Sequence, residues 1–324
     1  MKIKQSILVV TYNHEAYINE CLDSMINQTE LPYEIIISDD CSTDKTWDII
    51  KQYFLKYPKL FKIFRNKKNI GIFANIEKIR SYANGNIINF CPGDDLLKPK
   101  TIEKISNTIL KYNLNPDTDF FIIILNSIHL YPDGREWVWN NYKYMDYPLM
   151  KLKLRFGISF RCTGYSKLIL KNSMTEKKIL DIYPNLNLGA DTIKGFEELK
   201  NAKKTFFVDY AGPVYRLGVG ITSKLTTEYG LKSQLKLNEI IKKRYHKYWD
   251  KKDLLYIEYL SKSCEFKLNP SFKLFFTTIY YSFLNINNFT SNYPWIRSLN
   301  FLLSDKLYAF FKYKIYPLIR NFKN

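Results

Sequence analysis

The amino-acid sequence predicts an α/β domain with a parallel sheet, followed by a mostly helical C-terminal region. Short apolar runs alternate with helix-patterned segments near the start of the chain, which is the pattern of βαβ units. One of these runs ends in Asp39 and Asp40, and another leads by a short turn to Asp94 and Asp95. Ligands of open α/β sheets bind just outside the carboxyl ends of the strands. The two aspartate pairs therefore mark where a ligand site is expected.

Strands are predicted where a short apolar run is bounded by turn residues. These runs are residues 6–10, 34–38, 62–65, 86–90, 119–131 and 205–208. Helices are predicted where apolar residues recur at helical spacing, at residues 17–27, 47–55, 72–83, 98–112, 171–180 and 191–202. Ser42 or Thr43 is the expected N-cap of the second helix. Residues 135–165 give no clear pattern, and residues 211–223 are read as a glycine-rich loop.

Composition and charge divide the chain into two parts. The 324 residues are 46% hydrophobic, which is ample for a core, and carry a net charge of +18. The alternation of strands and helices stops near residue 226. We therefore expect one domain over residues 1–225 and a basic, aromatic, mostly helical region over residues 226–324. The charge leaves nucleic acid, an anionic membrane and an anionic small substrate open as partners.

The cysteines and the N-terminus favour a cytoplasmic protein. The five cysteines are scattered and form no Cys-x-x-Cys or Cys/His cluster, so neither a disulfide framework nor a zinc site is expected. His14, His129 and His246 are likewise too dispersed for a metal site. The N-terminus opens directly into a strand without a signal-peptide core, and no apolar stretch reaches the ~18 residues of a spanning helix.

Carboxylates that lie together at the end of a strand repel one another. A divalent metal ion with a phosphate group, or a nucleotide base, is the kind of partner that relieves this repulsion. The aspartates also have a purely structural interpretation, because Asx residues form turns and cap helices, and Pro and Gly are ordinary in a Pro-Gly-Asp-Asp turn. From the residues alone, both interpretations of Asp94 and Asp95 stay open.

Several segments resemble the motifs of family 2 glycosyltransferases, which are inverting enzymes. The matching segments are residues 6–13, 38–44, 69–71 and 90–95, with Asp191 and Tyr215–Arg216 further on. The resemblance implies the GT-A fold, a nucleotide-sugar-binding, Rossmann-like mixed sheet flanked by helices, over residues 1–225. Pro92 replaces the usual first aspartate of the metal motif. Cys41 replaces a usual glycine, so the turn after Asp40 is expected not to rely on a glycine-only conformation.

The same resemblance implies roles for individual residues. The donor-binding residues would be Thr11, Tyr12, Asn13, Asp39, Asn69, Gly71, Asp94 and Arg216. Asp39 would accept a hydrogen bond from a uracil N–H, and Tyr12 would pack on the base. Asp94, with Asp95 as a second candidate ligand, would hold Mn²⁺ or Mg²⁺ against the diphosphate. Arg216 would meet the diphosphate from the loop over residues 211–223.

An inverting displacement needs a base that takes the proton of the acceptor hydroxyl. The family places this aspartate at the start of a helix, and Asp191 fits that place. Asp191 has a plain alternative role as a helix N-cap. Glu197 and Glu198 are rival bases, expected a turn or more into the helix with one face solvated.

The C-terminal region interleaves basic and aromatic residues. Its basic pairs and triplets are residues 242–244 and 251–252, and its aromatic runs are residues 272–283 and 308–316. Such a region suits an anionic membrane surface or single-stranded nucleic acid, and the sugar-donor interpretation makes nucleic acid the less favoured of the two. A helical bundle with a solvated lysine face is the structural alternative.

We therefore expect a metal-dependent, hexosyltransferase-type enzyme. It would move a sugar from a nucleotide donor, UDP-linked by preference, to a glycan or lipid-linked acceptor in bacterial surface polysaccharide synthesis. It would work in the cytoplasm or at the inner face of the cell membrane. A nucleotidyltransferase would be expected to have a glycine- and lysine-rich phosphate loop near the first strand, and the sequence has none there. The remaining alternative is a catalytically degenerate sugar- or nucleic-acid-binding protein that uses the basic tail.

Overall fold

The chain forms two compact units. The computed structural model describes residues 2–140, 145–146, 148–156, 164–184, 186, 189–219, 227–271, 273–274, 276–278 and 280–281. The first unit is Met1–Pro184 with Ala190–Ser223, and the second is Asn185–Gly189 with Lys224–Asn324. The division at residue 225 into domains of different function stays a prediction.

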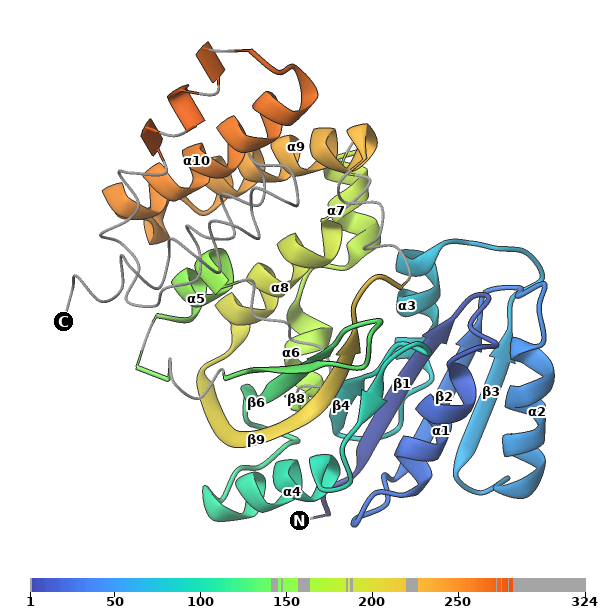
Figure 1. Ribbon diagram of the computed structural model, residues 1–324. Helices are drawn as coiled ribbons and strands as arrows, with labels where there is room; N and C mark the ends of the chain where they lie inside the picture. The colour runs from blue at the N-terminus through green and yellow to red at the C-terminus, as the bar shows by residue number, and fades with distance from the viewer. Residues whose placement is uncertain are drawn as a thin grey trace. The chain divides into compact units, whose positions relative to one another are not determined.

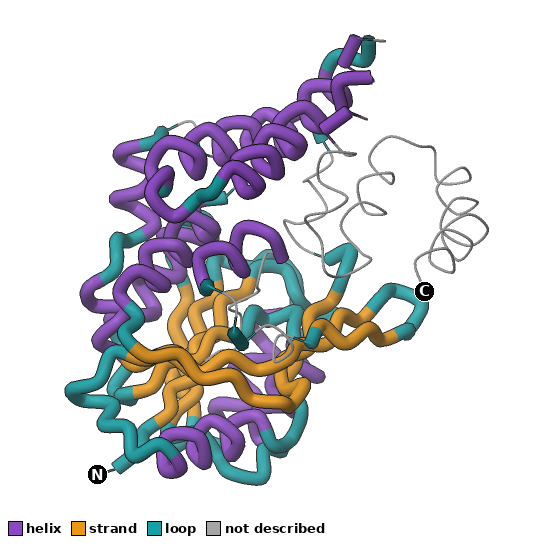
Figure 2. The backbone as a smooth tube through the Cα atoms, turned by 90° about the vertical axis from the view of Figure 1, so that its left-hand side faces the viewer, coloured by secondary structure: helices purple, strands orange, loops and turns teal. Residues whose placement is uncertain are grey.

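A mixed sheet forms the centre of the first unit (Figures 1 and 2). Its strands are β1 (Gln5–Thr11), β2 (Glu34–Asp39), β3 (Phe61–Arg65), β4 (Ile87–Phe90), β5 (Leu96–Leu97), β6 (Phe121–Leu130), β7 (Glu136–Trp139), β8 (Gly164–Ser166) and β9 (Lys204–Arg216). They lie in the order β3-β2-β1-β4-β8-β6-β9-β5, with β7 paired to β6. The pairs among β1 to β4 are parallel, and β8 joins β4 and β6 in antiparallel fashion.

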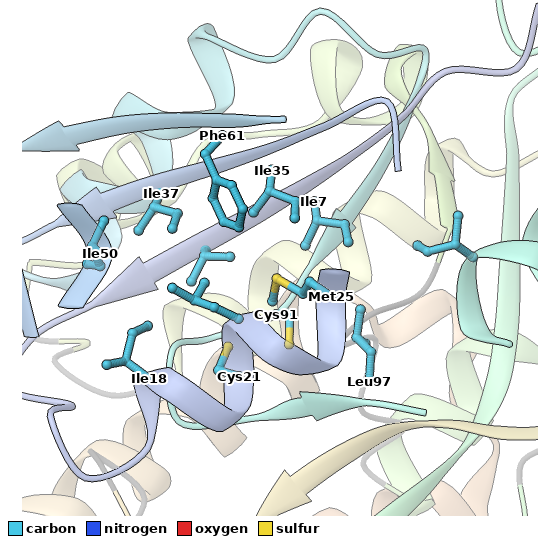
Figure 3. Close-up of a cluster of buried hydrophobic side chains, with 13 residues drawn as sticks. Ile7, Ile18, Cys21, Met25, Ile35, Ile37, Ile50, Phe61, Cys91 and Leu97 are labelled. Atoms are coloured by element: carbon cyan, nitrogen blue, oxygen red, sulfur yellow. The ribbon is translucent and has the colours of Figure 1, made fainter. Parts of the chain in front are cut away.

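Helices cover both faces of the parallel part of the sheet. The first unit contains α1 (Ile18–Ile26), α2 (Thr46–Lys56), α3 (Ile72–Ser81), α4 (Thr101–Lys111), α5 (Leu149–Phe156), α6 (Lys167–Asn172), α7 (Glu176–Ile182) and α8 (Ala190–Asn201). Side chains of a strand point alternately to its two faces. Ile7 and Ile35 accordingly pack with α1 and α2, as Figure 3 shows for α1, whereas Leu8 and Ile36 pack with Ile79 of α3. Burial on both faces explains why these strands are continuous apolar runs.

The strand order places a topological switch point at β1. The chain passes from β1 to β2 and β3 on one side and then returns to β4 on the other side. Pairing with β1 continues past the end of β4, because the Cys91 N–H donates to the Leu8 carbonyl (3.0 Å) and the Gly93 N–H to the Val10 carbonyl (3.0 Å). Ligands of such sheets bind in the crevice at this point. The fold therefore delivers Asp94 to the expected ligand site.

Three local predictions were wrong. The helix expected at residues 171–180 is two helices, α6 and α7, separated at Ser173, whose backbone is extended. Residues 211–216 are not loop, because β9 continues to Arg216 alongside β6 across two irregularities in pairing. Neither Ser42 nor Thr43 caps α2. Instead the Asp44 carboxylate accepts the Thr46 N–H (3.0 Å).

The second unit is helical over its described residues. α9 (Glu228–Arg244) and α10 (Lys251–Leu268) are joined by a short 3₁₀ turn (His246–Tyr248) and by an ion pair between Lys242 and Glu258 (3.1 Å). No helix in the described part of the chain is long and apolar enough to cross a membrane. Residues 308–316 and part of 272–283 lie outside the described residues, and membrane contact through this region stays a prediction.

Glu34 is a buried carboxylate that joins the starts of the strands. It accepts hydrogen bonds from the Ser6 hydroxyl (2.6 Å), the Lys62 ammonium (2.5 Å) and the Asn84 N–H (2.6 Å). Burial pushes its pKa upward, but these hydrogen bonds outweigh burial and the pKa is lowered. A group with a lowered folded-state pKa stabilises the fold above its unfolded-state pKa, and this contribution is lost as the pH falls through the folded-state pKa.

We predict that Glu34→Gln lowers the free energy of unfolding by about 2 kcal/mol at pH 7, because hydrogen bonds to a charged group are lost. The difference from wild type should begin to shrink below about pH 4, the ordinary pKa of a glutamate, and should be lost only as the pH falls through the lowered folded-state pKa. Urea denaturation at both pH values measures this. Asp48→Asn, which breaks only an exposed pair with Lys51, is the control and should change little. Equal stability of Glu34→Gln and wild type at pH 7 would refute the prediction.

Candidate functional site

Asp94 lies beside the end of β1 because Gly93 allows a close approach. A Cβ atom on Gly93 would lie 2.9 Å from the Thr11 Cβ and 3.0 Å from the His14 Nδ1. Real side chains do not tolerate such contacts, so a glycine is required here. The turn after β4 thus packs directly on the turn after β1, and Asp94 follows at that point.

Unsatisfied polar atoms surround this contact. Among the described residues, Thr11 Oγ1 and His14 Nδ1 are buried and have no hydrogen-bond partner. Burial lowers the pKa of His14, although the carboxylates of Asp94, Asp44 and Asp39 act in the opposite direction. His14 is therefore neutral near pH 7. Buried polar atoms without partners are rare in folded proteins, and an absent ligand is one explanation of them.

A metal ion at this point would need oxygen ligands from outside the protein. The described residues contain no group of three or more His, Cys, Asp and Glu that could hold one. Mg²⁺ is commonly held by one or two carboxylates together with substrate phosphates and water, and Mn²⁺ takes similar oxygen ligands. Asp94, only 8% exposed, and Asp95 fit that kind of site. The donor set therefore suits a metal that arrives with, or is completed by, a phosphorylated substrate.

Asp39 lies at the end of β2, opposite Thr11 in the register. It is fully buried, and its carboxylate accepts the Ser42 N–H (3.0 Å) and the Ser42 hydroxyl and pairs with Arg65 Nε (3.3 Å). Burial raises its pKa, against the opposing effect of Ser42 and Arg65. The Ser42 hydroxyl also accepts the Asn13 N–H (2.9 Å). One serine therefore joins the turns that follow β1 and β2.

Asp40 holds the turn that precedes α3. Its carboxylate accepts the N–H groups of Ile70 (2.9 Å) and Gly71 (2.9 Å) and an amide hydrogen of Asn66 (2.8 Å). Gly71 has a φ of 84°, a region that favours glycine, and the Asn69 side chain also accepts its N–H (3.1 Å). The sequence left the role of Asp40 open, and the structure shows that it fixes this turn.

Cys41 corrects one expectation. The turn after Asp40 was expected not to use a glycine-type conformation, but Cys41 has a φ of 64°. The left-handed region costs a non-glycine residue roughly 1–2 kcal/mol. The hydrogen bonds that Asp39, Asp40 and Ser42 make on either side of it hold the turn in this conformation.

Arg216 is fixed at the end of β9 rather than carried on a loop. Its N–H donates to the Asp95 carboxylate (3.0 Å), its guanidinium pairs with Glu20, and it lies 5.3 Å from the centre of the Tyr17 ring. Asp95 is 2% exposed. The second aspartate of the pair therefore ties β9 to the turn that carries Asp94.

Asp191 lies in the first turn of α8 and is exposed. Exposure leaves its carboxylate accessible, as a base would require. The expectation that Glu197 and Glu198 have a solvated face was wrong, because they are only 7% and 6% exposed. Burial raises the pKa of Glu198 to about 7, although the cations of Arg80 and Lys153 act against it.

The structure joins most of the predicted residues into connected groups. Thr11, Tyr12, Asn13 and Asp39 lie at the ends of β1 and β2, Asn69 and Gly71 are fixed by Asp40, and Arg216 reaches Asp95 beside Asp94. Asp191 stands apart on α8. Sequence reasoning missed Ser42 and the position of His14 in this site. The only signal that could have placed His14 in the site is that it follows closely after the end of the first strand.

Comparison with known proteins gives the family. The sequence model for glycosyl transferase family 2 matches residues 6–173, just over half of the chain. The protein Rv1520 of Mycobacterium tuberculosis is 40% identical over 114 residues, which are 35% of this chain and 32% of that protein. Poly(ribitol-phosphate) beta-glucosyltransferase of Bacillus spizizenii is 41% identical over 97 residues, or 29% of this chain and 15% of that enzyme. The match thus spans a third or less of these relatives.

Solved structures agree on the fold. Residues 1–349 of TarS from S. aureus, in complex with UDP-GlcNAc, superpose with a TM-score of 0.61 at 19% identity, over 87% of this chain and 80% of that one. The mannosyltransferase PcManGT from Pyrobaculum calidifontis, in complex with GDP-Man and Mn²⁺, superposes with a TM-score of 0.56 at 15% identity. The match covers 98% of this chain and 83% of that one. The predicted GT-A fold with C-terminal helices is confirmed, and the chain belongs to glycosyl transferase family 2.

Proposed function

We propose that this protein transfers a sugar, with inversion, from a nucleotide donor to a glycan or lipid-linked acceptor. One observation carries the proposal. The switch point of the sheet brings Asp94 beside two buried polar atoms, Thr11 Oγ1 and His14 Nδ1, that have no partner among the described residues. A phosphorylated ligand with a divalent cation supplies the charges and hydrogen-bonding groups that this arrangement lacks.

The donor we propose is a UDP-sugar. Tyr12, which is 43% exposed, offers a ring on which a base can stack, beside the turn that Asn13 and Ser42 hold. TarS was solved with UDP-GlcNAc and PcManGT with GDP-Man, and both share this fold. Asp39 is the proposed contact for the base, and the Ser42 and Arg65 contacts that now occupy its carboxylate would orient it.

Asp94, with Asp95 as its neighbour, is the proposed ligand set for Mn²⁺ or Mg²⁺. When bound, the cation would neutralise the diphosphate as it leaves. PcManGT was solved with Mn²⁺. Asp95 would act chiefly through the Arg216 N–H, which keeps the end of β9 against the turn that carries Asp94.

Asp191 is the proposed base. In a single displacement, the acceptor oxygen forms a bond to the anomeric carbon, the bond from that carbon to the phosphate oxygen breaks, and the hydroxyl proton passes to a carboxylate. Asp191 is exposed at the start of a helix, so an acceptor could reach it.

The acceptor class is proposed from the relatives. The chain is 41% identical over part of its length to an enzyme that glucosylates poly(ribitol-phosphate). We therefore propose a surface polymer or its lipid-linked precursor as the acceptor. The basic C-terminal region would then serve an anionic polymer or membrane surface.

The direct test is nucleotide release from a panel of UDP-, GDP- and dTDP-sugars, with Mn²⁺ and with a chelator. We predict metal-dependent release from one donor, and a loss of at least a hundredfold in Asp94→Ala because the diphosphate charge is no longer neutralised. Asp117→Ala, which removes an exposed carboxylate elsewhere, is the control. No release and no nucleotide binding would refute the proposal. Binding to wild type without release, with the acceptor present, would favour the degenerate binding protein.

We also predict that Asp191→Asn lowers kcat by 10²- to 10⁴-fold, because an amide cannot accept the proton. The Kd for the donor should stay within about twofold of wild type, since Asp191 is not proposed to contact the nucleotide. Stopped-time assays measure kcat, and calorimetry with the UDP-sugar measures the Kd for the donor. Full activity of Asp191→Asn would assign the base to another residue.

A further inference from the structure

A group of buried and half-buried charged side chains lies between α3 and α8. Arg80 pairs with Glu77 (3.3 Å) on its own helix and with Glu198 (3.7 Å) on α8. Lys194 of α8 lies 3.7 Å from Glu198 and 4.0 Å from Glu77. The side chains of Lys194 and Glu198 are only 4% and 7% exposed, and that of Arg80 is 16% exposed. The buried Lys194, the half-buried Arg80 and two acids thus link the two helices.

Arg80 also contacts the strand that leads to Asp94. Its guanidinium carbon lies 4.8 Å from the centre of the Phe90 ring, and Phe90 is the last residue of β4. The planar guanidinium can stack on a ring and bind carboxylates at its edge at the same time. One side chain therefore contacts α3, α8 and β4. Of these, α8 carries the proposed base, and β4 leads to the proposed metal ligand.

The face of α8 that meets Arg80 is the face that carries Asp191. Asp191, Lys194 and Glu198 are spaced by three and four residues, so they lie along one side of the helix. The negative charge of Asp191 also acts on Glu198. A rotation or slide of α8 against α3 would therefore carry Asp191 with it.

We propose that Arg80 is a positioning residue of the transfer reaction, which fixes the helix of Asp191 relative to the strand that leads to Asp94. This inference rests on the proposed function of both aspartates. Arg80 does not touch the reacting atoms. It acts because the acceptor oxygen and the anomeric carbon react only in a narrow geometry, and small displacements of a catalytic group can cost up to about a hundredfold in rate.

Burial of an ion pair is costly, so stability alone does not account for this group of charges. Replacing a buried pair by apolar residues is often neutral or stabilising, so such pairs are weak evidence for a stabilising function. The charges that act on Glu198 are Arg80 and Glu77 from α3, Lys153 from α5, and Lys194 and Asp191 from α8. Burial raises the pKa of Glu198 to about 7, so Glu198 gains its charge as the pH rises.

The experiment compares Arg80→Lys and Glu198→Gln with wild type in the full chain. Lysine keeps the charge of Arg80 but loses the planar face and the second arm. We expect Arg80→Lys to lower kcat about tenfold or more, with the Kd for UDP and the KM for the donor within about twofold. Hydrogen exchange of the α8 amides beyond its first turn should be faster. The control is Lys200→Met, which breaks the Lys200–Glu197 pair (3.0 Å) on the same helix and should leave kcat unchanged.

Glu198→Gln gives a signature that a purely structural role would not give. Glutamine resembles the protonated glutamate, so across a full pH profile the variant should match wild type at the acid end. It should fall behind wild type in kcat at the alkaline end, where only wild type forms the ion pair. This variant also covers the case in which Arg80→Lys does not fold. A ratio of kcat values that does not change with pH would overturn the inference, as would equal losses of kcat and donor affinity in Arg80→Lys.

Failure of this inference can be told from failure of the proposed function. If wild type releases no nucleotide, or if Asp191→Asn keeps full activity, the proposed function fails. If wild type is active and Asp191→Asn is not, while Arg80→Lys folds and keeps its kcat, only the role of Arg80 is refuted.

Discussion

The pairing of β1 with the turn after β4 is the constraint on which the rest of the site depends. Two backbone hydrogen bonds extend this pairing beyond the end of β4, and Gly93 allows the two turns to touch. Because β1 is also the strand at which the connections reverse, this contact lies where open α/β sheets bind their ligands. The position of Asp94 thus follows from backbone geometry, before any side-chain interaction is considered.

Side chains then fix the neighbouring turns relative to this point. Ser42 joins the turns after β1 and β2, and Asp40 fixes the turn before α3. Asp95 ties the end of β9 to the turn that carries Asp94. Each of these polar residues is buried and hydrogen-bonded, as buried polar groups generally are. Thr11 and His14, by contrast, each have one buried atom without a hydrogen-bond partner in the described part of the chain.

The parallel strands and their helices could be predicted because both faces of the sheet are buried, which gives continuous apolar runs between turn residues. The length of β9 was underestimated because its second half pairs with β6 across irregularities. A short-range sequence pattern does not reveal such pairing. The aspartates were found from their places at strand ends. The burial of Glu198 was missed because the charges that compensate it, Arg80 and Glu77, lie on a helix far away in the sequence. The contact between Arg216 and Asp95 was missed for the same reason, because these two residues are also far apart in the sequence.

The most direct test of the account is a crystal structure with UDP and Mn²⁺, with anomalous data collected at the manganese absorption edge. The account predicts an anomalous peak within bonding distance of the Asp94 carboxylate, with the diphosphate of UDP bound beside Thr11 and His14. An Asp94→Asn crystal should lose the peak. A nucleotide bound away from the ends of β1 and β4, or a manganese ion held without Asp94, would contradict the account.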